Sequence, residues 1–166
     1  GDTFVCYGDS VQLPAFASST SNNISRFLWS PASYIDDVHF AAPYVFPPVD
    51  KDYTVTVSNG RCNPRIFPVH VSVKPLPIVD AGADTIIIAG MTTYLNASSP
   101  NTVSFNWTPD INLSCAACEV AAATPNSTTE YLVLVTDSFG CQATDSKIIR
   151  VIEKCNEHAV FVPNLF

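Results

Sequence analysis

The tripeptide Trp29-Ser30-Pro31 recurs as Trp107-Thr108-Pro109, and the alternating run Tyr53-Thr54-Val55-Thr56-Val57 recurs as Tyr131-Leu132-Val133-Leu134-Val135. In both copies the tyrosine follows the tryptophan by 24 residues. A spacing that is kept over this distance indicates a tandem duplication, in which each unit is about 78 residues long, the offset between the two tryptophans.

Apolar and polar residues alternate in both units, which is the period of a half-buried β-strand. Val11 and Leu13 show it in the first unit, as do Val69, Val71 and Val73. Turn signals such as Ser-Pro and Asn-Gly separate these short runs. We therefore predict an all-β fold of two tandem antiparallel sandwiches of the immunoglobulin (Ig) type, with one tryptophan in the core of each.

Two prolines mark the boundary between the units. In Lys74-Pro75-Leu76-Pro77 they stop the last strand of the first unit and stiffen the connection. We expect one domain over residues 1–75 and a second over residues 76–153. Residues 154–166 then form a polar connector and the start of a further, C-terminal element.

Composition excludes several classes of protein. Of the 166 residues 47% are hydrophobic and 14% charged, which excludes disorder, and no apolar run approaches the roughly 18 residues of a membrane-spanning helix. The net charge of -7 repels phosphate backbones, so nucleic acid is excluded as a partner. Six cysteines favour an oxidising, extracellular compartment. Gly1 in place of methionine indicates a mature or excised chain.

Three further motifs carry a family resemblance. They are Gly8-Asp9-Ser10-Val11-Gln12-Leu13, Asp80-Ala81-Gly82-Ala83-Asp84 and the insertion Leu113-Ser114-Cys115-Ala116-Ala117-Cys118. Together with the Trp and Tyr motifs they resemble the PKD-like or Ig-like tandem repeats of surface and secreted proteins of Bacteroidota, and the resemblance covers about 150 of the 166 residues.

The tail Val160-Phe161-Val162-Pro163-Asn164-Leu165-Phe166 is similar to the opening of the gliding-motility-associated C-terminal domain, a type B sorting signal of the type IX secretion system. The resemblance implies export across the outer membrane and display on the cell surface, or release from it, often as part of a long adhesin. An apolar strand without a partner exposes its backbone edge. We therefore expect Val160, Phe161, Val162 and Phe166 to add to another sheet, either of a C-terminal domain or of a secretion or surface partner.

The cysteines predict two bridges. Cys6 lies on the first expected strand and Cys62 at the hairpin before the last, and we predict a structural disulfide between them. Cys115 and Cys118 enclose two residues, so a bridge between them would shape a loop.

The Cys115 and Cys118 pair has two alternative interpretations. A thioredoxin-like redox site needs a helix that starts at the first cysteine, and the following residues do not predict one. A zinc site would have to recruit Cys141 and Cys155, but a single C-x-x-C is a weak signal for zinc. The pairing of Cys141 and Cys155 stays open.

No catalytic constellation is evident in the sequence. His39, His70 and His158 stand far apart, without a hydrolase or metalloprotease motif nearby. The adjacent carboxylates Asp36-Asp37 are typical of turns and local caps. We therefore expect no enzyme activity, no catalytic residue, no metal and no cofactor.

Two sets of residues are candidates for surface roles. Phe40, Tyr44 and Phe46 form an aromatic stretch that the second unit lacks, and they are a candidate for partner binding. Asp-[Ser/Thr]-apolar triplets resemble the O-glycosylation acceptor of Bacteroidota. The candidate acceptors are Thr3, Ser10, Thr85 and Ser138.

These features predict a non-catalytic structural and interaction module, a stalk or spacer in a secreted, adhesin-like cell-surface protein. Its expected partners are secretion or surface proteins and extracellular glycans. The alternative is a carbohydrate-binding or accessory module of a secreted hydrolase, which a catalytic domain upstream of Gly1 would favour.

Overall fold

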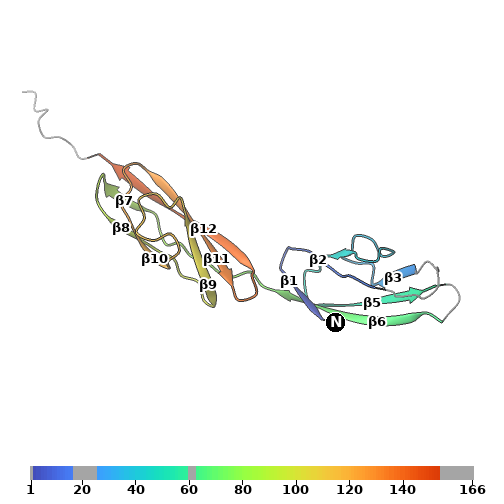
Figure 1. Ribbon diagram of the computed structural model, residues 1–166. Helices are drawn as coiled ribbons and strands as arrows, with labels where there is room; N and C mark the ends of the chain where they lie inside the picture. Colours follow the sequence, from blue (N-terminus) through green and yellow to red (C-terminus); the bar gives the residue numbers. More distant parts are fainter. Residues whose placement is uncertain (1, 17–25, 60–62, 154–166) are drawn as a thin grey trace, which may run out of the picture. The chain divides into compact units, whose positions relative to one another are not determined.

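The computed structural model describes residues 2–16, 26–59 and 63–153, and all regular structure within them is β-strand (Figure 1). The chain divides into two compact units, Gly1–Leu76 and Pro77–Phe166. We had expected domains over 1–75 and 76–153, and the expected third segment, 154–166, lies outside the described residues. The predicted all-β fold with two sandwiches is confirmed. No helix long and apolar enough to cross a membrane occurs in the described part of the chain.

Unit 1 packs a sheet of four strands against a sheet of two. Its strands are β1 (Thr3–Cys6), β2 (Val11–Gln12), β3 (Arg26–Ser30), β4 (Tyr44–Val45), β5 (Lys51–Ser58) and β6 (Arg65–Lys74). The larger sheet has the order β1-β6-β5-β3, and β2 pairs with β4. Alternate side chains of these strands are buried and, with Leu13 just after β2, form one core. It is made of Val5, Leu13, Trp29, Val45, Tyr53, Val55 and Val71.

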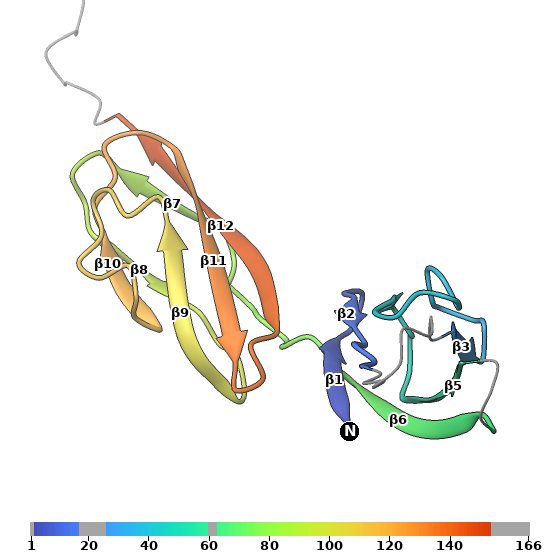
Figure 2. The ribbon, with the colours of Figure 1, turned by 45° about the vertical axis from the view of Figure 1, so that its right-hand side comes forward.

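Unit 2 repeats this plan. Its strands are β7 (Thr85–Ile88), β8 (Thr93–Asn96), β9 (Thr102–Thr108), β10 (Val120–Ala123), β11 (Thr129–Asp137) and β12 (Gln142–Ile152). The larger sheet has the order β7-β12-β11-β9, in which β9, β11 and β12 lie side by side (Figure 1, Figure 2), and β10 pairs with β8. Its separate core centres on Leu95, Trp107, Tyr131, Val133 and Ile149.

The first strand of each unit departs from the predicted antiparallel pattern. β1 runs parallel to β6, with Val5 opposite Val73, and β7 runs parallel to β12. After β1 the chain turns at Gly8, whose φ of 88° is a left-handed conformation that glycine adopts without strain, and crosses to the small sheet. Because of this crossing β1 forms no hairpin with the next strand and pairs instead with the last strand of its unit.

The two tryptophans occupy the same place in the two cores, as predicted. Trp29 is 3% exposed and Trp107 is 1% exposed. A buried indole N–H needs an acceptor. The indole N–H of Trp29 donates to the carbonyl oxygen of Phe40, and that of Trp107 donates to the carbonyl oxygen of Cys118, both at 3.0 Å.

Tyr53 on β5 and Tyr131 on β11 attach their strands to the loop between the third and fourth strands of their unit. The Tyr53 hydroxyl shares its proton between the carbonyl oxygens of Ser33 (3.1 Å) and Tyr34 (3.2 Å), and the Tyr131 hydroxyl donates to that of Ile111 (3.2 Å). Burial, with a smaller contribution from Tyr34, raises the pKa of Tyr53 to about 12. The phenol therefore stays a hydrogen-bond donor at physiological pH.

The Asp80-Ala81-Gly82-Ala83-Asp84 motif has a structural role at the start of unit 2. Asp80 Oδ1 accepts the backbone N–H of Gly82 at 2.8 Å, and Asp84 Oδ1 accepts that of Ile148 on β12 at 2.9 Å. These bonds fix the entry of β7 beside β12, because they satisfy N–H groups that the strand ladder leaves open.

We predict that Trp29→Ala and Trp107→Ala each unfold one unit and leave the other folded, because the two cores are separate clusters. Each truncation should cost about 3–5 kcal/mol of its unit's free energy of unfolding. Hydrogen exchange resolved by peptide would measure this, with protection lost only in the substituted unit. Loss of protection in both units from one substitution would contradict the prediction.

Candidate functional site

The loop between the third and fourth strands of each unit carries the acceptor for the buried tryptophan. In unit 2 a disulfide joins Cys115 and Cys118 across this loop, with a Cα to Cα distance of 5.7 Å. Trp107 donates its backbone N–H to Ala116 and its indole N–H to Cys118, so the bridge closes the segment that holds the tryptophan.

Unit 1 holds the equivalent loop with carboxylates instead of a disulfide. Asp37 Oδ1 accepts the backbone N–H of His39 at 2.8 Å. Asp36 Oδ1 accepts the N–H groups of Asp37 (2.7 Å) and Tyr44 (2.9 Å). The adjacent aspartates are therefore local caps, in agreement with the sequence interpretation.

The predicted Cys6 to Cys62 bridge stays a prediction, because Cys62 lies outside the described residues. Cys6 is disulfide-bonded and stands opposite Lys74, at the end of β6.

The parallel direction of β1 places Cys6 at the Lys74 end of β6, which sequence separation alone does not tell. Cys141, which the sequence left unassigned, is buried and is also disulfide-bonded.

We predict that non-reducing peptide mapping of the folded chain finds Cys115 and Cys118 bridged to each other. Cys6 should also be found bridged, and its predicted partner is Cys62. A reduced and alkylated sample is the control for exchange during digestion. A crosslink from Cys6 to a cysteine other than Cys62 would contradict the predicted pairing.

Two of the three predicted aromatic residues share the outer face of the small sheet in unit 1. Val45 of β4 is fully buried, so its neighbours Tyr44 and Phe46 point to the opposite, solvent side, where each is 48% exposed. Phe40 lies in the preceding loop, where its own carbonyl oxygen accepts the indole N–H of Trp29.

Tyr34 joins this face, although no motif in the sequence points to it. A bridge pairs Ile35 with Val45, and the N–H of Phe46 donates to the carbonyl oxygen of Tyr34 at 3.0 Å. The rings of Tyr34 and Phe46 meet edge to face, with centroids 6.2 Å apart, and Lys51 Nζ lies 5.4 Å from the Tyr34 ring centroid. Gln12 of β2 is the register partner of Tyr44.

The backbone of Tyr34 has a φ of 61°, in the left-handed region. A residue with a bulky side chain is strained there, by about 1–2 kcal/mol. Asn112 has the same φ of 61° at the equivalent place in unit 2, and asparagine is among the residues that tolerate it. An alignment of the two halves of the sequence would have shown tyrosine against asparagine, but not the backbone conformation.

His70 is the side chain with the clearest electrostatic partner. Its Nδ1 lies 2.6 Å from Asp52 Oδ1, across the paired strands β5 and β6. The hydrogen bond to Asp52 raises the pKa of His70, a smaller desolvation effect opposes this, and the charges of Asp52, Asp50 and Asp2 add to the rise. The pair is exposed and joins two neighbouring strands, and it becomes a cross-strand ion pair when His70 is protonated.

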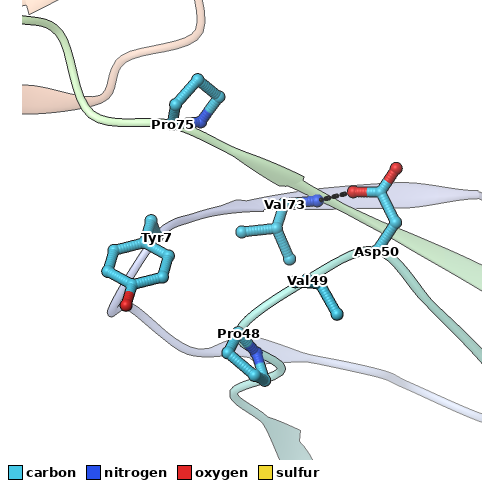
Figure 3. Close-up of a pocket in the computed structure, with 6 residues that line it drawn as sticks. All are labelled: Tyr7, Pro48, Val49, Asp50, Val73 and Pro75. Carbon is cyan, nitrogen blue, oxygen red and sulfur yellow. Dashed lines mark hydrogen bonds between the residues drawn. The ribbon is translucent and has the colours of Figure 1, made fainter.

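An open depression lies on unit 1 (Figure 3), with a volume of about 420 Å³. Its lining is largely apolar and comprises Tyr7, Pro48, Val49, Asp50, Val73 and Pro75. Asp50 Oδ1 accepts the N–H of Val73 at 2.7 Å, so the one carboxylate of the depression is engaged by the backbone. No group of three or more His, Cys, Asp or Glu side chains arranged to hold a metal occurs among the described residues.

The remaining predicted sites are distributed over both units. Thr3 on β1 and Thr85 on β7 are half-buried, whereas Ser10 and Ser138 are exposed outside the strands. The tail residues Val160, Phe161, Val162 and Phe166 lie outside the described residues.

No protein-family model matches the sequence, and no curated protein matches it. The chain is similar to the solved PKD domain from KIAA 1837 protein (26% identity, 47% of this chain and 88% of that one, TM-score 0.41). It is also similar to Sidekick-1 immunoglobulin domains 1-5 (11%, 92% and 38%, TM-score 0.42) and to the insect immune protein hemolin (11%, 90% and 44%, TM-score 0.40). The chain thus spans less than half the length of the last two, and the fold assignment rests on the sheet topology above.

We predict that Asp52→Asn lowers the pKa of His70 toward the ordinary value of about 6.5. Because the folded-state pKa is raised, the pair stabilises the fold below pH about 6.5 and loses this effect as pH rises through the raised pKa. Titration of the His70 ring signals by NMR would measure the His70 pKa in the unmodified chain and in the Asp52→Asn variant. Asp37→Asn is the control, which should leave the His70 titration unchanged. Equal His70 pKa values with and without Asp52 would contradict the prediction.

Proposed function

We propose that this chain is a non-catalytic structural and interaction module, a stalk or spacer of a secreted, adhesin-like cell-surface protein that the type IX system exports. The observation that carries the proposal is the repeated architecture. Two sandwiches of one plan, each with its own core, give a chain that can be extended by adding units. The motif residues hold each sandwich together: Trp29 and Tyr53 do so in unit 1, and Trp107 and Tyr131 in unit 2.

The chemistry of the chain supports an extracellular setting. The described residues include a loop disulfide and two further disulfide-bonded cysteines, and disulfides persist in oxidising compartments. The similarity of the tail to a sorting signal supports the proposed route of export. The expected glycan acceptors Ser10 and Ser138 are accessible, as O-glycosylation on export would require.

A carbohydrate-binding or accessory module of a secreted hydrolase is the second candidate. It is favoured by the aromatic side chains exposed together on the small sheet of unit 1. The two candidates differ in what the parent protein carries before Gly1, either further repeats or a catalytic domain.

We predict that antibodies against this chain label intact cells of the source organism. External protease should remove the label while a cytoplasmic marker stays intact. Disabling the type IX system should abolish the surface label and leave the protein inside the cell. Surface labelling that persists without the type IX system would refute the proposed route, and an intracellular location in unmodified cells would refute the function.

A further inference from the structure

The aromatic face of unit 1 is defined here as Gln12, Tyr34, Tyr44, Phe46 and Lys51, on the solvent side of the small sheet. The fold does not require its rings. Unit 2 builds the same sheet around the equivalent buried residue, Ala123, with a bridge from Leu113 to Ala123 in place of the one from Ile35 to Val45.

The residues of unit 2 that correspond to the three rings are small or polar. At the offset of 78 residues, Asn112 replaces Tyr34, Ala122 replaces Tyr44 and Thr124 replaces Phe46. Two copies of one scaffold therefore differ at the solvent-facing positions, where packing imposes no ring. Exposed aromatic clusters that packing does not explain mark interaction sites.

The strain at Tyr34 is a second, independent observation. Both units place this residue at a φ of 61°, but only unit 1 uses a bulky side chain there. Strained conformations persist where the surroundings impose them, and they cluster at ligand-binding sites. In this conformation the Tyr34 ring lies on the face beside Phe46.

The rings are also held in place before any ligand arrives. Tyr34 is fixed by its contact with Phe46, by Lys51 over its ring, and by its carbonyl oxygen, which accepts from the Tyr53 hydroxyl. The N–H of Tyr44 donates to Asp36 Oδ1. A rigid face loses little conformational entropy on binding, which favours measurable affinity from a small contact.

The area of the face decides between classes of partner. Three rings, each 44–48% exposed, offer roughly 300 Å² of aromatic surface. A stable protein–protein interface needs about 800 Å² on each partner. The face is therefore too small for a stable protein interface by itself and suits a ligand of a few rings.

The polar groups around the rings indicate the chemistry of that ligand. Gln12 is the strand partner of Tyr44 on one side of β4. Asp36 lies on the other side of β4, where its backbone N–H donates to the Tyr44 carbonyl oxygen at 3.0 Å. An amide and a carboxylate beside flat rings match a ligand with apolar C–H faces and hydroxyl groups at its edges. The single cation, Lys51, is already over Tyr34, and the neighbouring Asp36 and Asp37 disfavour an anion.

We propose that the aromatic face of unit 1 binds a neutral glycan, by stacking sugar rings on Tyr34, Tyr44 and Phe46. Sugar hydroxyls would donate hydrogen bonds to the Asp36 carboxylate and to the amide oxygen of Gln12, whose Nε2 already donates to the Ala42 carbonyl oxygen at 3.0 Å. This inference rests on the proposed interaction function and names its ligand class. Unit 2 keeps one ring on the equivalent face, Tyr94, which is 63% exposed and stands opposite Ala122. A lone ring gives no stacking platform, so unit 2 serves as an internal control.

Affinity electrophoresis of the purified 166-residue chain tests the proposal, in gels that contain hydroxyethylcellulose, arabinoxylan, galactomannan or glycogen. At least one of these neutral polysaccharides should retard the chain. Tyr44→Ala and Phe46→Ala should weaken the retardation at least tenfold, and the control Tyr94→Ala should leave it unchanged. If none of the four retards the folded chain, the proposal is overturned, while the stalk function stands on its own export experiment.

Tyr34→Asn separates binding from folding. It introduces the residue that unit 2 carries at the same φ, so the melting temperature should stay equal or rise while binding falls at least tenfold. Retardation of Tyr34→Asn and Tyr44→Ala equal to that of the unmodified chain would overturn the proposal. A second experiment places a photoreactive group at position 44 and crosslinks the chain on intact cells. A crosslinked protein that excess polysaccharide does not displace would also overturn the proposal.

Discussion

Each sandwich depends on the hydrogen bond between a buried indole and the loop that covers it. The indole N–H of Trp29 or Trp107 cannot stay unpaired in an apolar core, so the loop must present a carbonyl oxygen at one place. The same loop carries the carbonyl oxygens that accept from the buried tyrosine on the neighbouring strand. Core and loop are therefore fixed together in both units.

The two units meet this constraint by different chemistry. Unit 2 closes the loop covalently through Cys115 and Cys118, whereas unit 1 uses the carboxylates of Asp36 and Asp37. With the loop held in either way, the solvent side of the small sheet is free to vary. Unit 1 carries three aromatic rings there, whereas unit 2 has small or polar side chains at those three positions and one ring, Tyr94, elsewhere on the face.

The sequence was sufficient to predict the duplication, the all-β fold and the burial of both tryptophans, because period and spacing report directly on these features. It was not sufficient for the parallel first strand, since alternation is the same in parallel and antiparallel pairs. The direction of that strand also decides which end of the sheet Cys6 reaches, so the sequence could not place this residue. The role of Tyr34 depends on a backbone angle that no residue pattern displays.

The parallel pairing of the first and last strands has a mechanical consequence. The chain enters a unit at the start of β1 or β7 and leaves it at the end of β6 or β12, so its two attachment points lie at opposite ends of one strand pair. Tension along the chain then loads the hydrogen bonds of that pair in shear, many at once, instead of opening them one after another. A unit built in this way resists extension until the whole pair gives way, which is a useful property in a tether.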